Sequence, residues 1–126
     1  IVENGGDIFL KTSRTRVVGI YAGRSRLLSS LCLAIKPKDT PMGICTSSGT
    51  IGHSLSFGEA DSVVILSRSA ILADAVATAT CNLIHSRADM QKALDFARGV
   101  KGVNAVVIIF RNNLITWGNV EFVKRK

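Results

Sequence analysis

The run Ser62-Val-Val-Ile-Leu-Ser67 constrains the fold of this chain most. Its apolar residues follow one another without alternating with polar ones, which is the pattern of a β-strand covered on both faces. The Ala-rich segment that follows, from Ser69 or Ala70 to about His85, favours a helix because alanine has the highest helix propensity. The sequence therefore predicts a buried strand followed directly by a helix.

A second helix is predicted from Arg87 to Arg98, with Ser86 as its N-cap, Asp89 at the capping-box position and Gly99 as its stop. A loop is predicted over 37–43, because proline does not fit inside a sheet. Further strands are predicted over residues 7–12, 16–21, 30–36, 103–110, 114–117 and 120–123. Most of these strands are joined by short turns, so the predicted class is α+β, with a largely antiparallel sheet and two main helices.

Composition limits the classes of protein to consider. A chain of 126 residues with 47% hydrophobic content corresponds to one domain with a core of its own. Its apolar runs are far shorter than the roughly 20 residues of a membrane span, and no signal-peptide pattern precedes them, so a cytoplasmic protein without membrane contact is expected. Cys32, Cys45 and Cys81 are odd in number and widely spaced, which argues against a disulfide framework and a zinc site.

A formal charge of +7 raises the question of a nucleic-acid partner. The basic residues are spread over turns and termini, at 11–16, 24–26, 36–38 and 124–126, and aromatic residues make up only 6% of the chain. Nucleic-acid modules usually concentrate both types on one surface. A solvated basic surface is therefore favoured over a nucleic-acid interface, and the same charge also suits a small anionic ligand.

The beginning of the sequence resembles the middle of a structural unit. It opens on Ile1, and Asn4-Gly-Gly-Asp7 is a turn signal between two strand-like segments. This pattern predicts further residues upstream, or their supply by another polypeptide. Open sheet edges would then favour association with that segment, with another chain or with a second copy.

Two segments carry the chemistry. Thr46-Ser-Ser-Gly-Thr-Ile-Gly-His53 is a cluster of small and hydroxylated residues of the kind that closes on a phosphate. Asp74 and Thr78 are four residues apart, so on a helix their oxygens lie on one face, as ligands of Mg2+ would. The residues alone leave an alternative open at each place. Asp74 also suits a residue flanking the helix start, and His53 also suits an ordinary loop position.

These landmarks, in this order, resemble the ApbE family of FAD:protein FMN transferases: the Asn4–Asp7 turn, Thr46–Gly49, His53, and the strand leading to Asp74 and Thr78. The resemblance implies that residues 1–126 are the C-terminal portion of one ApbE-like domain of an uncharacterised branch. It implies that Gly5, Gly6, Thr46, Ser47 and Ser48 bind FAD or a related nucleotide. It further implies Mg2+ on Asp74 and Thr78, and a catalytic role for His53.

The segment after His53 departs from that family. The transferases continue their histidine with two hydrophobic residues, Asp-Pro and Thr-Gly, whereas this chain reads His53-Ser-Leu-Ser-Phe-Gly58. The predicted function is therefore binding of a flavin or related nucleotide with Mg2+, with transfer chemistry altered or lost. The alternatives are an active Mg2+-dependent enzyme that cleaves the FAD pyrophosphate and transfers FMN, and a basic nucleic-acid-binding module.

Overall fold

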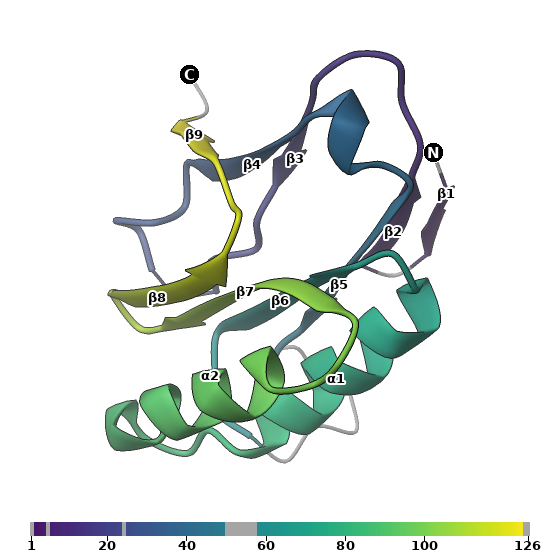
Figure 1. The fold of residues 1–126 in the computed structure, drawn as a ribbon. Helices are drawn as coiled ribbons and strands as arrows, with labels where there is room; N and C mark the ends of the chain where they lie inside the picture. The colour runs from purple at the N-terminus through teal and green to yellow at the C-terminus, as the bar shows by residue number, and fades with distance from the viewer. Residues whose placement is uncertain (1, 5, 24, 50–57, 125–126) are drawn as a thin grey trace.

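The protein has three layers, a pair of helices, a six-stranded sheet and a three-stranded sheet (Figure 1). The computed structural model describes residues 2–4, 6–23, 25–49 and 58–124. Every strand pair in this part of the chain is antiparallel. The predicted α+β class with a largely antiparallel sheet and two main helices is thereby confirmed.

The six-stranded sheet is the central layer. Its strand order is β1-β2-β5-β6-β7-β8. The strands are β1 (Val2–Asn4), β2 (Asp7–Leu10), β5 (Met42–Ser47), β6 (Ser62–Ser67), β7 (Val103–Phe110) and β8 (Asn113–Gly118). All six residues of β6 are buried, as the unbroken apolar run predicts for a strand covered on both faces.

The three-stranded sheet covers the face of the central sheet that the helices leave open. It has the order β3-β4-β9, with β3 (Arg16–Gly19), β4 (Leu31–Ile35) and β9 (Phe122–Lys124). A short 3-10 turn, η1 (Pro37–Asp39), connects β4 to β5. The connection over residues 13–15 therefore joins strands of two different sheets.

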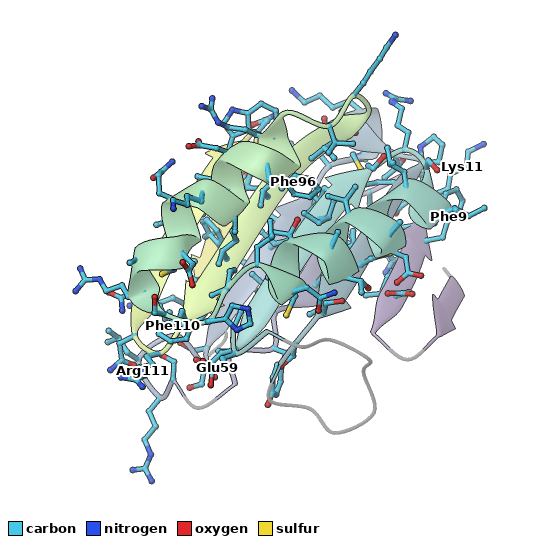
Figure 2. The ribbon with its side chains drawn as sticks, turned by 90° about the horizontal axis from the view of Figure 1, so that it is seen from below. Phe9, Lys11, Glu59, Phe96, Phe110 and Arg111 are labelled. Carbon is cyan, nitrogen blue, oxygen red and sulfur yellow. The ribbon has the colours of Figure 1, made fainter. Side chains whose placement is uncertain are left out.

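The helices cover the other face of the central sheet. The first is α1 (Ala70–Asn82), and its N-cap is Ser69, whose side chain accepts a hydrogen bond from the backbone N–H of Leu72 at 3.1 Å. The second is α2 (Met90–Arg98), preceded by the 3-10 turn η2 (Arg87–Asp89). The predicted capping box of Ser86 and Asp89 is present. Figure 2 shows both helices lying across the sheet from the helical side.

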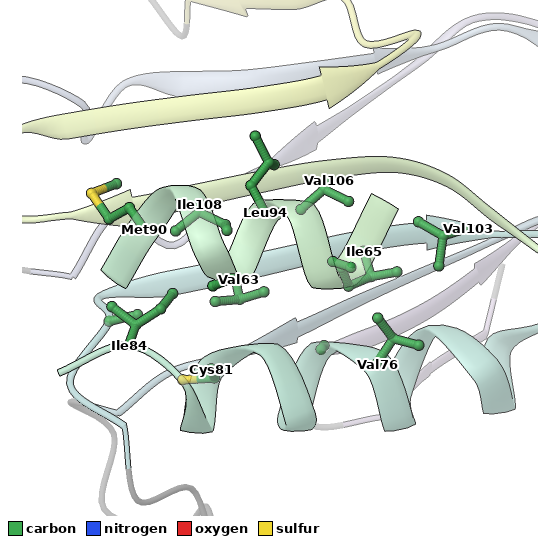
Figure 3. Packing of buried hydrophobic residues seen from close by; sticks show 14 of the residues in the cluster. Val63, Ile65, Val76, Cys81, Ile84, Met90, Leu94, Val103, Val106 and Ile108 are labelled. Carbon is green, nitrogen blue, oxygen red and sulfur yellow. The ribbon is translucent and has the colours of Figure 1, made fainter. Parts of the chain in front are cut away.

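Two hydrophobic clusters hold the layers together, one on each face of the central sheet. The cluster under the helices includes Val63, Ile65, Val106 and Ile108, all nearly inaccessible to solvent (Figure 3). The cluster toward the three-stranded sheet includes Leu33 together with the strand residues of the opposite pleat. Alternate residues of β6 and β7 thus belong to different clusters, because successive side chains of a strand point to opposite faces.

The strand β5 is the element that the sequence did not indicate. Residues 37–43 were predicted as a loop and Thr46–His53 as a phosphate cradle, but residues 42–47 form a strand paired with both β2 and β6. This difference decides how the candidate site is built.

Candidate functional site

Two carboxylates lie within electrostatic range of each other where β2 begins beside α1. Asp7 is the first residue of β2, and Asp74 lies in the second turn of α1. Burial raises the pKa of the Asp7 carboxyl above its usual range, the negative charge of Asp74 raises it further, and a hydrogen bond with the Cys45 thiol opposes both. Among the residues that the structure describes, neither carboxylate forms an ion pair with a lysine or arginine. The two acidic groups therefore share one environment without a described cation.

Strand pairing and a close helix contact bring them together. Asp7 stands opposite Cys45 in the β2–β5 ladder. Gly43, on β5, lies directly under the first residue of α1, since a Cβ atom there would come within 2.7 Å of the Cα of Ala70. The absence of a side chain at Gly43 lets α1 approach β5 closely, and this places Asp74 over the β2–β5 pair.

Cys45 is a hydrogen-bond donor at this place and is poorly suited to nucleophilic attack. Its thiol lies 3.5 Å from the carbonyl oxygen of Ala70 and also contacts Asp7. Burial, followed by the charge of Asp7, raises the pKa of the thiol to about 12. The thiolate is the reactive form of cysteine, so a thiol that stays protonated at neutral pH does not act as a nucleophile.

Two hydroxyl groups extend the site along the same helix face. The hydroxyls of Ser47 on β5 and Thr78 on α1 are 3.2 Å apart and hydrogen-bonded. Thr78 is one helical turn beyond Asp74, as predicted, and it is partly exposed while Ser47 is buried. We call Asp7, Asp74, Thr78 and Ser47 together the acidic site.

A cavity of about 340 Å3 lies on the other face of the central sheet, between it and the three-stranded sheet. Gly6, Thr46 and Ser48 line it, and these are three of the residues that the sequence assigned to nucleotide binding. Its remaining walls are mostly apolar and come from both sheets, namely Ile8, Val18, Ile20, Tyr21, Leu33, Ile44 and Val64. We call it the inter-sheet cavity.

The predicted nucleotide-binding residues are thus divided between two faces. Thr46 and Ser48 face the inter-sheet cavity, whereas Ser47 faces α1. Thr46 and Ser47 belong to the β5 ladder, so they do not form a loop that closes on a phosphate, and their predicted role in nucleotide binding stays a prediction. The N–H of Gly49 is also engaged, since it donates to the carbonyl of Ala60 at 2.9 Å. Gly5 and His53 lie outside the described residues, so their predicted roles stay predictions.

Asp7 is the site residue that the sequence analysis did not single out for metal binding. The signal was present, because Asp7 follows the Asn4-Gly-Gly turn and opens a strand, but its partner comes from a helix far along the chain. The described residues contain no group of three or more His, Cys, Asp or Glu side chains arranged to hold a metal ion. Among the described residues, a cation at the acidic site would have two carboxylates and the Thr78 hydroxyl as ligands, and other groups would complete its shell.

Comparison with known proteins identifies relatives along nearly the whole chain. A family model described as "AbpE bacteria" matches residues 1–121. A UPF0280 protein of Methanospirillum hungatei is 46% identical over 99% of this chain and 50% of its own length. UPF0280 proteins of Methanocella arvoryzae and Methanocaldococcus jannaschii are 42% and 37% identical, over 99% and 98% of this chain and 51% and 53% of their own lengths.

These matches correct the resemblance inferred from the motifs. The relatives are described as UPF0280 proteins, and neither they nor the family model identify residues 1–126 as the C-terminal part of an ApbE flavin transferase. That assignment was wrong because its landmarks are short and rich in glycine and hydroxyl residues, a composition shared by many turns and strands. The chain spans about half the length of the relatives it matches. Within the described residues, no helix has the length and apolar character that a membrane crossing requires.

Proposed function

We propose that this chain, which belongs to the family described as "AbpE bacteria", binds a nucleotide such as FAD together with Mg2+. The acidic site would hold the cation beside the phosphates, and the inter-sheet cavity would take the planar ring. The observation that carries the proposal is the pair of carboxylates at Asp7 and Asp74, close enough for one to raise the pKa of the other.

The chemistry of the acidic site favours Mg2+. Asp7 is partly buried and Asp74 is exposed, and their like charges repel each other. A divalent cation between them would be attracted to both. Mg2+ is usually held by one or two carboxylates, with waters and substrate phosphates completing its shell. Such a partial shell would be formed by Asp7, Asp74 and the hydroxyl of Thr78. Two carboxylates would then be enough to hold Mg2+, because waters and the ligand phosphates complete its coordination.

The inter-sheet cavity suits a planar, mostly apolar ring. Its volume of about 340 Å3 falls at the lower end of the range of small-molecule pockets. Aliphatic walls from both sheets would cover the faces of a ring, and the hydroxyls of Thr46 and Ser48 would bond its polar edge. The same cavity includes Tyr21, whose ring is partly exposed and available for stacking.

The two parts lie at one end of the central sheet. Gly6 and Asp7 are neighbours in sequence, as are Thr46 and Ser47, and each pair contributes one residue to either face. Gly6 adopts φ of 99°, and among the described residues the nearest atom to a Cβ placed there is the Thr46 carbonyl oxygen, at 3.8 Å. The absence of a side chain at Gly6 leaves room for an extended ligand to pass from the cavity toward the acidic site.

The proposal assigns binding to these residues and leaves transfer chemistry to other groups. Cys45 is protonated at neutral pH, and the acidic site offers no other thiol, imidazole or amine among the described residues. Any cleavage of a pyrophosphate bond would therefore need a proton-transfer group from elsewhere in the chain, such as His53, or from a partner.

Isothermal titration calorimetry with FAD and with ADP, each carried out once in Mg2+ and once in EDTA, would test this function. The method covers the expected range of Kd, from about micromolar to about millimolar. We expect saturable binding that requires Mg2+ and weakens at least about tenfold in Asp7→Asn and in Asp74→Asn, since charged ligands of a cation are lost. The matched control is Asp95→Asn, an exposed acidic residue on α2. Equal affinity with and without Mg2+, or in both site variants, would contradict the proposal.

A further inference from the structure

A second cavity, of about 170 Å3, opens at the other end of the space between the two sheets. It is lined near the start of β5 and the end of β6, by Met42 and Leu66, whereas the inter-sheet cavity reaches Thr46 and Val64 on the same strands. Leu33 lines both cavities, but none of the polar or charged residues assigned above to nucleotide or cation binding lines this one. We call it the Arg68 cavity, and the proposed function gives it no role.

The walls of the Arg68 cavity combine an apolar floor with charged and amide groups at the rim. The floor is made by Leu33, Ile35, Met42, Leu66, Ala105 and Val120. The charged and polar lining residues include Arg68, Asp39, Asn104 and Asn119, which we call the rim groups. An apolar pocket with a few convergent polar groups is the usual form of a small-molecule site.

The rim groups are not engaged with the protein itself. Within the part of the chain that the structure describes, the side chains of Arg68, Asp39, Asn104 and Asn119 form no hydrogen bond or ion pair. Glu121, which also lines the cavity, is already paired with Lys36 at 3.4 Å. Arg68 and Asp39 line the same small cavity with opposite charges, and among the described contacts they do not pair with each other.

We infer that the Arg68 cavity binds a free aliphatic α-amino acid, such as leucine. The carboxylate of the ligand pairs with the guanidinium of Arg68, and its ammonium pairs with the carboxylate of Asp39. The amides of Asn104 and Asn119 supply further hydrogen bonds to these groups. The aliphatic side chain enters the apolar floor.

Size and charge agree with this class of ligand. A cavity of about 150 Å3 accommodates a benzene molecule, so one of about 170 Å3 holds a branched aliphatic side chain while the charged groups remain at the mouth. A simple anion would satisfy Arg68 and leave Asp39 repelled, and a simple cation would do the reverse. A ligand that carries both charges can pair with Arg68 and with Asp39 at once.

The test is a calorimetric or saturation-transfer titration with L-leucine, for which we expect a Kd of about 1 mM or tighter. Arg68→Gln and Asp39→Asn should each weaken binding at least about tenfold, because each removes one charge-assisted contact. Arg14→Gln and Asp95→Asn are the matched controls, since both residues are exposed and outside the cavity. Both cavity variants replace partly or fully exposed side chains, and circular dichroism would verify that they fold.

Analogues test the recognition of both charges and the source of the ligand. N-acetyl-leucine lacks the ammonium group, leucinamide lacks the carboxylate, and glycyl-leucine and leucyl-glycine represent the ends of a peptide. We expect each of the four to bind at least about tenfold more weakly than leucine. The inference is overturned if leucine shows no saturable binding, if the variants bind it as the parent does, or if any analogue binds as tightly as leucine.

Discussion

Gly43→Ala is the substitution that most directly probes how the candidate site is assembled. A Cβ atom at residue 43 would lie 2.7 Å from the Cα of Ala70 and 3.0 Å from both its Cβ and its N, whereas ordinary contact begins at 3.4 Å. The atoms in the way belong mainly to the backbone of α1, so a rotamer change cannot relieve the clash. We expect α1 to shift away from β5 by about 0.7 Å at its first turn, the shortfall in that contact.

Two opposing effects decide the stability of this variant. Overpacking of this kind costs about 1–3 kcal/mol. Replacing glycine also restricts the unfolded chain, which contributes about 0.4–1 kcal/mol in the opposite direction. The net expectation is a loss of about 1–2 kcal/mol, and for a chain of this length a melting temperature lower by about 4–8 °C.

Thermal unfolding by circular dichroism, in buffer containing EDTA, measures this loss without involving any ligand. Gly99→Ala is the matched control, because Gly99 has ordinary helical dihedrals and its nearest contact to an added Cβ is 3.3 Å. We expect that variant to stay within about 0.5 kcal/mol of the parent or to gain stability. An unchanged or raised melting temperature for Gly43→Ala would refute the close approach of α1 to β5.

Three further predictions follow from the pKa shifts and burial. Cys32, Cys45 and Cys81 are all buried, so a thiol reagent at pH 8 should modify none of them rapidly in the folded protein and all three after unfolding; fast modification of Cys45 would contradict its raised pKa of about 12. Hydrogen bonds from the backbone N–H of His85 and Ser86 lower the pKa of Asp89, so this residue stabilises the fold at neutral pH and loses that contribution as the pH falls through its folded pKa, below 3.8. Asp89→Ala should therefore lower the melting temperature at pH 7 and have little effect at about pH 2; an equal effect at both values would disprove the ionic origin. The pKa of Asp7 is raised from 3.8, so its ionisation lowers the stability of the fold as the pH rises past that value. In EDTA, Asp7→Asn should therefore raise the melting temperature at pH 7 and leave it unchanged at about pH 3. A lower melting temperature of this variant at pH 7 would contradict the prediction.

The sequence predicted those parts of the fold whose signals are local. Strands β6 and β7 occur as predicted, because long apolar runs of β-branched residues have few other structures available to them. The short turn between the strands predicted over 103–110 and 114–117 is also present, and Arg111 there adopts a positive φ of 56°. The capping box at Ser86 and Asp89 was also predicted correctly, because all of its atoms lie within four consecutive residues.

The parts that failed depend on partners distant in sequence. Strand β5 contains Gly43, a residue type that is depleted in strands, and it forms because β2 and β6 pair with both of its edges. Once β5 is a strand, alternation sends Thr46 and Ser47 to opposite faces, and the single predicted cradle divides into two places. The division of the strands into two sheets is likewise invisible to a local pattern.

The sequence predicted one part of the candidate site, the pair on α1, and missed the part on β2. Asp74 and Thr78 do share a helix face, because a spacing of four residues fixes that relation wherever a helix forms. Asp7 was missed as their neighbour, because only the β2–β5 register and the close approach at Gly43 bring it under α1. The carboxylate pair is thus a product of tertiary structure.

The central claim is that a divalent cation binds between Asp7 and Asp74. Substitution of Mn2+ for Mg2+ tests it most directly. A paramagnetic ion broadens the NMR signals of nearby nuclei, so the broadened signals show where the ion binds. We predict that substoichiometric Mn2+ selectively broadens the backbone amide signals of Asp7, Cys45, Asp74 and Thr78, that excess Mg2+ restores them, and that Asp7→Asn prevents the effect. Broadening centred on other acidic residues, such as Glu59 or Asp95, would contradict the account. So would broadening no stronger than the non-specific effect of unbound Mn2+ in solution.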